Sequence, residues 1–112
     1  MILHKKTVID LVKPCADGRI EVRIAKQTVL NGELLKSEWH RTAVDPLGDV
    51  DAQFGLVNTH LDQLGYSPLS EADLSMIRTV TTIHRSTPDI AARIEALRIQ
   101  READEAAAKV EV

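Results

Sequence analysis

The stretch RIEVRIAKQTVLNGELLKSEWHR, residues 19–41, has the pattern of a long β-hairpin with its turn at Asn31-Gly32. Both central residues of a type I′ turn need a positive φ, and Asn and Gly tolerate that conformation better than other residues do. Strand-forming residues alternate with polar ones on both sides of the turn. The sequence therefore predicts two antiparallel strands, about residues 19–30 and 33–43.

An uninterrupted ladder from this turn pairs Ile24 with Trp39, and alternation then gives the hairpin two unlike faces. The apolar face contains Ile20, Val22, Ile24, Thr28, Leu35 and Trp39. The polar face contains Glu21, Arg23, Gln27, Lys36, Glu38 and His40. Antiparallel sheets commonly bury one face and leave the other in water. Because Lys26 and Ser37 interrupt the apolar face, we expect the outer end of the hairpin to project beyond the core.

One more strand is predicted before the hairpin, at residues 7–12 (TVIDLV). It should end at Pro14, because proline lacks the N–H that a ladder needs. Asp17-Gly18 then turns the chain into the hairpin, which makes the three strands a meander. Whether residues 2–3 extend the first strand is open.

Three helices are predicted to follow the sheet, at about residues 50–64, 70–83 and 88–98. Asp49 or Asp51 suits the N-cap of the first, and Gly65 suits a left-handed residue after its last turn. The end of the second, TVTTIHRS, is rich in β-branched residues, so this segment can also stop early or be extended. Thr87-Pro88 suits the start of the third.

The first of these helices is the expected cover of the sheet. Its apolar residues, which include Phe54, Val57 and Leu61, recur at spacings of three and four and form one stripe. We expect this stripe to pack on Trp39 and the apolar face around it. The sequence thus predicts a single α+β domain, residues 1–98, with two or three helices on one face of the sheet.

Residues 99–112 form an alanine-rich, charged tail that can be helical but has little to bury against its own domain. Apolar residues outside the expected core lie along this tail and at the outer end of the hairpin. They form a candidate protein interface of Val29, Leu30, Leu34, Ile99, Ala103, Ala106 and Val110. Small residues at helical spacing let another helix or sheet approach closely. The alternative is an exposed hairpin tip and a solvated tail without any partner.

The composition of the 112-residue chain, 44% hydrophobic and 28% charged, is that of one soluble globular domain. Its net charge of -3 and its scattered basic residues disfavour a nucleic-acid partner, because Lys and Arg contacts to phosphate dominate such affinity. No apolar run resembles a signal peptide or approaches the ~20 residues of a membrane span. We therefore expect no nucleic acid, no membrane, and synthesis in a cytoplasm.

The residues that could carry catalysis or bind a metal are few: His4, His40, His60, His84 and the single Cys15. The chain contains no H-E-x-x-H, C-x-x-C or G-x-S-x-G motif and no phosphate-binding loop. Alternation places His40 near Glu38 on the wet face, where nothing excludes water from an acid–base pair. We therefore expect no enzymatic activity, no cofactor and no metal.

At SEWHRTAVDPLGDVDA (37–52) and IHRSTPDIAARIEAL (83–97), the chain resembles small proteins encoded among the tail and tail-fibre genes of tailed bacteriophages. The matching positions are Asp17-Gly18, Trp39-His40-Arg41, Pro46 with Gly48-Asp49, and Thr87-Pro88 with Ala91 and Ala92. The resembled proteins read as a strand meander with an Asp-Gly turn, a hairpin strand ending in aromatic-His-Arg, a P-G-D-type turn, a short helix and a final helix that starts T-P-x-x-x-A. This chain departs from that pattern by inserting Leu47 between Pro46 and Gly48 and by having a longer middle helix than those proteins. The match covers most of the chain but consists of turns and caps, and it brings no functional residues.

The resemblance implies a non-enzymatic structural or adaptor component of a phage virion. Such a component would be tail-associated and would bind other virion proteins or further copies of itself. The thin core, the projecting hairpin and the alanine-rich tail favour this hypothesis. The alternative is a non-virion accessory protein, such as a tail-assembly chaperone or a host-directed binding protein, that stays in the host cytoplasm. The negative net charge of the chain and the solvated terminal helix favour that alternative.

Overall fold

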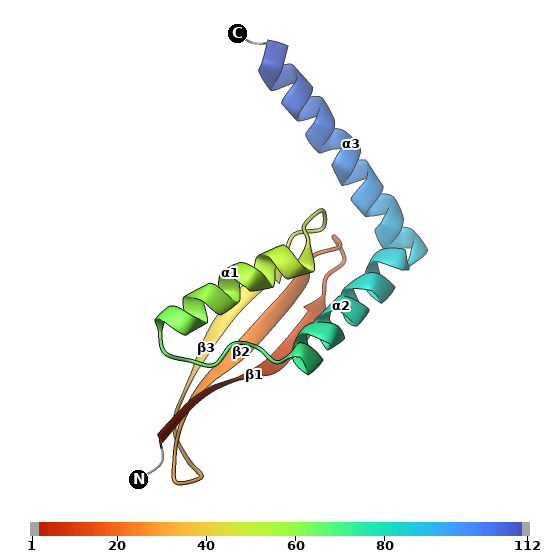
Figure 1. Cartoon of the computed structure of the whole chain (residues 1–112). Coiled ribbons are helices and arrows are strands. Elements are labelled where there is room, and N and C mark those ends of the chain that lie inside the picture. The colour runs from red at the N-terminus through yellow and green to blue at the C-terminus, as the bar shows by residue number, and fades with distance from the viewer. Residues whose placement is uncertain (1–2, 111–112) are drawn as a thin grey trace.

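The computed structural model describes residues 3–110, which form a three-stranded antiparallel sheet followed by three helices (Figure 1). The strands are β1 (Leu3–Pro14), β2 (Ile20–Leu30) and β3 (Glu33–Val44), in the spatial order β1-β2-β3. The helices are α1 (Val50–Gln63), α2 (Glu71–Ser86) and α3 (Pro88–Val110). The predicted α+β meander is confirmed. Ile2, part of the possible extension of the first strand, and residues 111–112 of the predicted tail lie outside the described residues.

The hairpin turns at Asn31-Gly32 as predicted, and both residues have a positive φ, 50° and 83°. The ladder is regular as far as the pair Val29–Leu34 and then shifts by one residue. Leu35 is the extra residue of a β-bulge in β3. Since side chains alternate along a strand, one extra residue turns the rest of β3 over.

The bulge at Leu35 reverses which side chains of β3 face the helices. Trp39 pairs with Ala25 rather than with Ile24, and it is 58% exposed on the face away from the helices. The predicted burial of Trp39 beneath α1 is therefore wrong, and so is that of Leu35, which is 57% exposed. His40 pairs with Ile24 and lies on the helix-covered face, so its predicted place on the wet face is also wrong.

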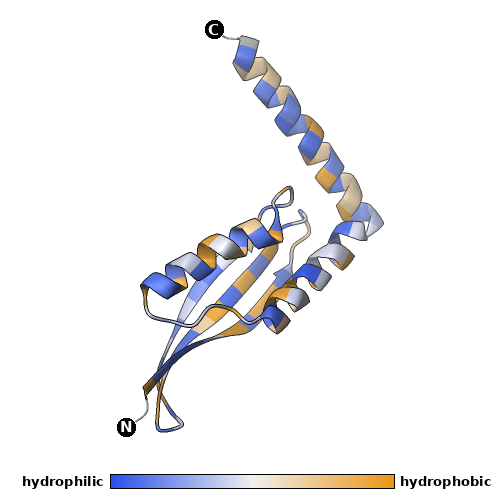
Figure 2. Cartoon of the chain, in the orientation of Figure 1, coloured by the Kyte–Doolittle hydropathy of each residue, from blue (hydrophilic) through white to orange (hydrophobic). Residues whose placement is uncertain are grey.

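The core lies between the sheet and the helices α1 and α2. Ile20, Val22 and Ile24 face the helices as predicted, and none is more than 2% exposed. They form one cluster with Val44, Val50, Phe54, Val57, Leu61, Leu69 and Ile77. Figure 2 shows the alternation of apolar and polar residues along β2 that places these side chains on one side.

The ends of α1 are fixed by its caps. Asp49, one of the two predicted N-caps, accepts a hydrogen bond from the backbone N–H of Ala52 at 2.9 Å. Gly65 has a φ of 81°, and the N–H of Tyr66 donates to the carbonyl of Leu61 at 3.0 Å. This is the long bond of a Schellman motif, which a residue in the left-handed conformation makes possible.

α3 is one continuous helix that includes both the predicted third helix and the described part of the tail. As far as Arg101, α3 is anchored to loops at one end of the sheet. Arg93 donates to the carbonyl of Ala16 at 2.7 Å, and Arg101 pairs with Asp45 at 2.8 Å. Beyond Arg101 the helix projects away from the sheet (Figure 1). The resulting radius of gyration is 17.7 Å, against about 13 Å for a compact domain of this length.

Gly55 offers a site for stabilisation, because an added Cβ at this exposed position of α1 would meet nothing within 4 Å. We expect Gly55→Ala to raise the free energy of unfolding by up to ~1 kcal/mol, since glycine is unfavourable inside a helix. Thermal melting followed by circular dichroism measures this. Gly18→Ala is the matched contrast and should destabilise, because Gly18 has a φ of +95° and its Cβ would lie 2.7 Å from Cγ1 of Ile94. A lower melting temperature for Gly55→Ala would contradict the packing described.

Candidate functional site

The face of the sheet opposite the helices, which we call the open face, is not covered by any helix within residues 3–110. The register of the strands, which contains a bulge at Leu35 in β3 and a second one between Ile9 and Leu11 in β1, assigns several large apolar side chains to this face. They are Val8, Leu11, Leu34 and Trp39, and each is between 41% and 58% exposed. Trp39 stands in the central row of the face, where Val8, Ala25 and Trp39 lie side by side on the three strands.

The side chain of Trp39 is held in one orientation. Its indole N–H donates to Oδ2 of Asp10 at 2.8 Å, and the guanidinium of Arg23 lies 5.6 Å from the ring centroid. Nε of Arg23 lies 2.8 Å from the same oxygen at an angle too bent for a directed hydrogen bond, so this contact is an ion pair. Asp10 reaches Trp39 because it is the extra residue of a second bulge, between Ile9 and Leu11. A fixed aromatic side chain loses little entropy on binding a partner.

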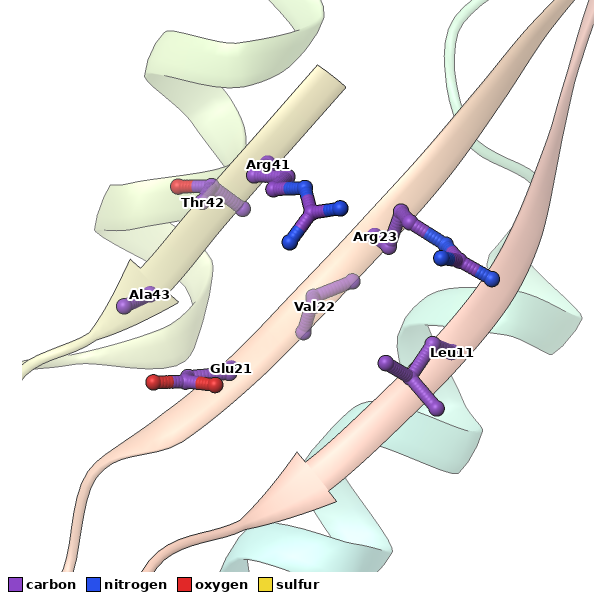
Figure 3. A pocket seen from close by; sticks show the side chains of 7 residues that line it. All are labelled: Leu11, Glu21, Val22, Arg23, Arg41, Thr42 and Ala43. Atoms are coloured by element: carbon purple, nitrogen blue, oxygen red, sulfur yellow. The ribbon is translucent and has the colours of Figure 1, made fainter. Parts of the chain in front are cut away.

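An open hollow of about 360 Å³ lies in the open face, next to the row of Trp39. It is lined by Leu11, Glu21, Val22, Arg23, Arg41, Thr42 and Ala43 (Figure 3). Arg23 and Arg41 come from neighbouring strands and are direct cross-strand partners. Arg23 is paired with Asp10, so a carboxylate of a partner would be favoured beside Arg41, which has no such partner among the described residues.

The charge of the open face is positive and largely unpaired. Both of its carboxylates have partners, because Asp10 pairs with Arg23 and Glu21 with Arg19. In the part of the chain that the structure describes, three basic side chains of this face have no ionic partner: Lys6, Lys13 and Arg41. A partner that brings carboxylates would therefore meet uncompensated positive charge.

The candidate interface residues predicted from the sequence lie at two ends of the molecule rather than together. At the outer end of the hairpin lie Val29, Leu30 and Leu34. On the far part of α3 lie Ile99, Ala103, Ala106 and Val110, of which the side chain of Val110 is outside the described part. Leu34 and Ile99 are each 55% exposed. Figure 1 shows these two ends on opposite sides of the helix-covered sheet.

The residues of the open face that the sequence did not predict lie between the two ends, above all Leu11, Trp39 and Arg41. A ladder without bulges places Trp39 and Arg41 on the buried face instead. The sequence nevertheless contained a signal for the bulge, because an uninterrupted ladder places Arg41 opposite Val22 on the buried face. An unpaired buried charge is very unfavourable. The bulge puts Thr42 opposite Val22 instead.

Three of the four histidines, His40, His60 and His84, take part in contacts within the chain. Nε2 of His84 lies 2.6 Å from the carbonyl oxygen of Cys15, and the rings of His40 and His60 have their centroids 5.4 Å apart. Among the described residues, no three His, Cys, Asp or Glu side chains gather where they could share a metal ion. None of the helices in residues 3–110 is long and apolar enough to cross a membrane.

The partly buried His40 makes the stability depend on pH. Burial, and after it the charges of His60 and Lys26, hold the pKa of His40 below its ordinary 6.5. The unfolded chain then binds this proton more readily than the folded one, so acidification below about pH 6.5 favours unfolding. Asp45 makes the stability depend on pH in a more acidic range. Hydrogen bonds from Arg101 hold the pKa of this carboxyl below its ordinary 3.8, so the stability that this contact contributes is lost when acid protonates Asp45.

Chemical unfolding at about pH 7 and about pH 5 measures this effect. We expect His40→Gln to lose less stability between the two conditions than the wild type does. His4→Gln removes an exposed histidine and should keep the wild-type dependence. Equal dependence in His40→Gln and wild type would show that His40 titrates as it does in the unfolded chain.

Comparison of the chain with protein-family models, with curated proteins and with solved structures finds no match. The residues of the open face form an ordered apolar surface around Trp39 with unpaired basic side chains at its margin. Such a surface is suited to a partner that combines apolar side chains with carboxylates.

Proposed function

We propose that the protein is a non-enzymatic structural or adaptor component that acts by binding other protein chains. The observation that carries this proposal is the open face, where an ordered Trp39 and neighbouring aliphatic side chains are left uncovered. Large apolar side chains exposed next to one another, as Trp39, Val8 and Leu11 are, often mark interaction sites in soluble proteins. Ordered tryptophan and arginine side chains are also the residues that most often dominate binding energy at interfaces.

A protein partner fits this surface better than a nucleic acid does. Single-stranded nucleic acids bind to several aromatic side chains on which successive bases stack. Among the described residues of the open face the aromatic side chain with a large ring surface is Trp39, and its apolar neighbours Leu11 and Val8 are aliphatic.

The setting that we propose is the tail of a bacteriophage virion, where the partners are other virion proteins or further copies of this chain. The resemblance to tail-region proteins at Trp39-His40-Arg41 and Thr87-Pro88 supports this setting. The elongated shape, with α3 projecting from one end, suits a subunit that contacts more than one neighbour. The second candidate is a phage accessory protein in the host cytoplasm, such as a tail-assembly chaperone or a host-directed binding protein.

Mass spectrometry of purified particles, combined with surface substitutions, tests this proposal. We expect the protein in the particle, and we expect Trp39→Glu to lower its incorporation by about tenfold or more, as for a residue that dominates an interface. Leu56→Glu is the matched control, because Leu56 is 71% exposed on α1 and lies on the opposite side of the molecule. Equal incorporation of the two variants would contradict the role of the open face. Absence from particles, with particle assembly still dependent on Trp39, would favour the accessory protein.

A further inference from the structure

We propose that the edge of β3 pairs with the edge of β3 from a second copy of the chain, antiparallel and about a two-fold axis at Ser37. The six strands of the two copies then form one continuous sheet. This inference concerns the edge of the sheet rather than the open face, so it does not rest on the proposed function. Two observations carry it: β3 is an uncovered edge, and the middle of β3 is complementary to itself.

The edge at β1 is covered by the segment that follows α1. β1 and β3 are the outer strands of the sheet, so each has backbone groups that point away from β2. On β1, the N–H of Ser67 donates to the carbonyl of Lys5 at 3.2 Å, and the N–H of Thr7 donates to Oγ of Ser67 at 3.3 Å. The hydroxyl of Thr7 also donates to the carbonyl of Ser67 at 3.0 Å. These contacts prevent another strand from pairing with the middle of β1.

The edge at β3 has no such cover. Within the described residues 3–110, no backbone-to-backbone hydrogen bond joins residues 35–41 to a segment outside the hairpin. Every residue of this stretch is exposed or half-buried. α1 reaches His40, whose ring lies 5.4 Å from that of His60 near the end of the helix, and the outer end of the hairpin projects beyond α1 (Figure 1). An edge of this kind binds an added strand through main-chain hydrogen bonds.

The apolar side chains of this stretch are arranged symmetrically about Ser37. Leu35 and Trp39 lie two residues before and two residues after it, and alternation places all three on the open face. In an antiparallel pair with its axis at Ser37, Leu35 of one copy lies opposite Trp39 of the other, and this contact occurs twice. The two side chains are 57% and 58% exposed, so both have apolar surface to bury. Apolar pairs directly opposite each other stabilise a sheet.

The charged side chains fix the register of the pair. Lys36 and Glu38 flank Ser37, so Lys36 of one copy lies opposite Glu38 of the other. Within one copy the two already pair at 2.8 Å, so their charge does not drive association. A shift of the axis by one residue, however, places either Lys36 opposite Lys36 or Glu38 opposite Glu38. Like charges directly opposite each other destabilise a sheet, so the axis at Ser37 is favoured over both neighbouring registers.

The arrangement closes with two copies. A two-fold axis uses the same edge of both chains, and the two edges that are left are those of β1, which Ser67 covers. The same cover prevents β3 of one copy from pairing along the middle of β1 of another. We therefore expect a dimer rather than an open chain of subunits. Because the axis is perpendicular to the sheet, the open faces of both copies lie on the same side of the dimer.

An exchange of charge between the two copies tests this inference with full-length chains. One edge variant carries Lys36→Glu and the other carries Glu38→Lys, at side chains that are 64% and 46% exposed. In a dimer of either variant alone like charges face each other, whereas in a dimer of one chain of each kind every carboxylate faces an ammonium group. Lys109→Glu and Glu105→Lys are the matched controls, because they make the same changes of charge at exposed positions of α3. Circular dichroism checks the fold, and light scattering coupled to gel filtration gives the molar masses.

We expect the wild type and both control variants to have twice the molar mass of one chain. Each edge variant alone should have the mass of one chain, and the equimolar mixture of the two should return to twice that mass. A monomeric wild type, edge variants that dimerise alone as the wild type does, or a mixture that stays monomeric would overturn the inference.

Cross-linking at the axis is a second measurement that does not depend on charge. In a Cys15→Ser background, Ser37→Cys should form a disulfide-linked dimer on mild oxidation. Residues opposite each other in an antiparallel pair have Cα atoms about 4.5–5.5 Å apart, a distance that a disulfide spans. Lys36→Cys in the same background should form far less, because position 36 lies opposite position 38 of the other copy. Equal cross-linking at the two positions would contradict the axis at Ser37.

Discussion

Phe54→Ala is expected to remove a large part of the free energy of unfolding and to shift denaturant unfolding to clearly lower concentrations than in the wild type. Phe54 is 1% exposed and packs in the core between α1 and the sheet. Removing a large buried aromatic side chain typically costs ~3–5 kcal/mol, and the whole stability of a small domain is about 5–15 kcal/mol. Denaturant titration followed by circular dichroism measures the loss.

Trp39→Ala is the control for this prediction, because it also truncates an aromatic side chain. Trp39 is 58% exposed, and its replacement removes one hydrogen bond to Asp10. We expect a loss of only about 1 kcal/mol, the usual contribution of such a bond. If Trp39→Ala unfolds the chain as readily as Phe54→Ala does, Trp39 is buried and the bulge at Leu35 is wrong.

Ile77→Ala is expected to have the second largest effect on stability. Ile77 is fully buried, at 0% exposure, and it joins α2 to the core. Truncation of a buried isoleucine typically costs ~2–5 kcal/mol. Because α2 leads directly into α3, a loosened α2 should also release the contacts of Arg93 and Arg101 that direct α3.

Met76→Ala tests whether this effect belongs to the buried side of α2. Met76 is the neighbouring residue and is 42% exposed. We expect it to change the free energy of unfolding by less than about 1 kcal/mol, as exposed positions usually do. Thermal unfolding of the two variants side by side gives the comparison. Similar losses at both positions would mean that α2 is packed through a different side.

The local features that a few neighbouring residues determine could be predicted from the sequence. The turn at Asn31-Gly32 follows from the positive φ that these residues accept. The caps of α1 at Asp49 and Gly65 follow from the side-chain oxygen of the one and the conformational freedom of the other. The alternation of Ile20, Val22 and Ile24 likewise identified the buried side of β2.

The open face could not be predicted in the same way, because it depends on two bulges. The bulge at Leu35 exchanges Trp39 and Arg41 for His40 and Thr42 on the helix-covered face. Its energy comes from contacts distant in sequence, since it keeps the guanidinium of Arg41 in water and lets Val44 become buried at 1% exposure. A ladder drawn from the turn alone does not contain these contacts.

The direction of α3, like the open face, could not be predicted from the sequence. Its helical pattern beyond Arg98 was visible in the sequence, together with the stripe of Ile99, Ala103 and Ala106. The direction of the helix depends on Arg101 and Asp45, which are 56 residues apart in the chain. Only the structure shows that this contact turns the stripe away from its own domain.

The most direct test of the account is the quenching of Trp39 fluorescence by acrylamide, in dispersed chains and in the assembled state. Trp39 is the only tryptophan, so the signal reports on the open face alone. We expect strong quenching in dispersed chains. In the assembled state we expect protection from the quencher together with a blue shift of the emission, because the partner covers the indole. Equal quenching in both states would show that the open face stays uncovered and would contradict its role as the binding surface.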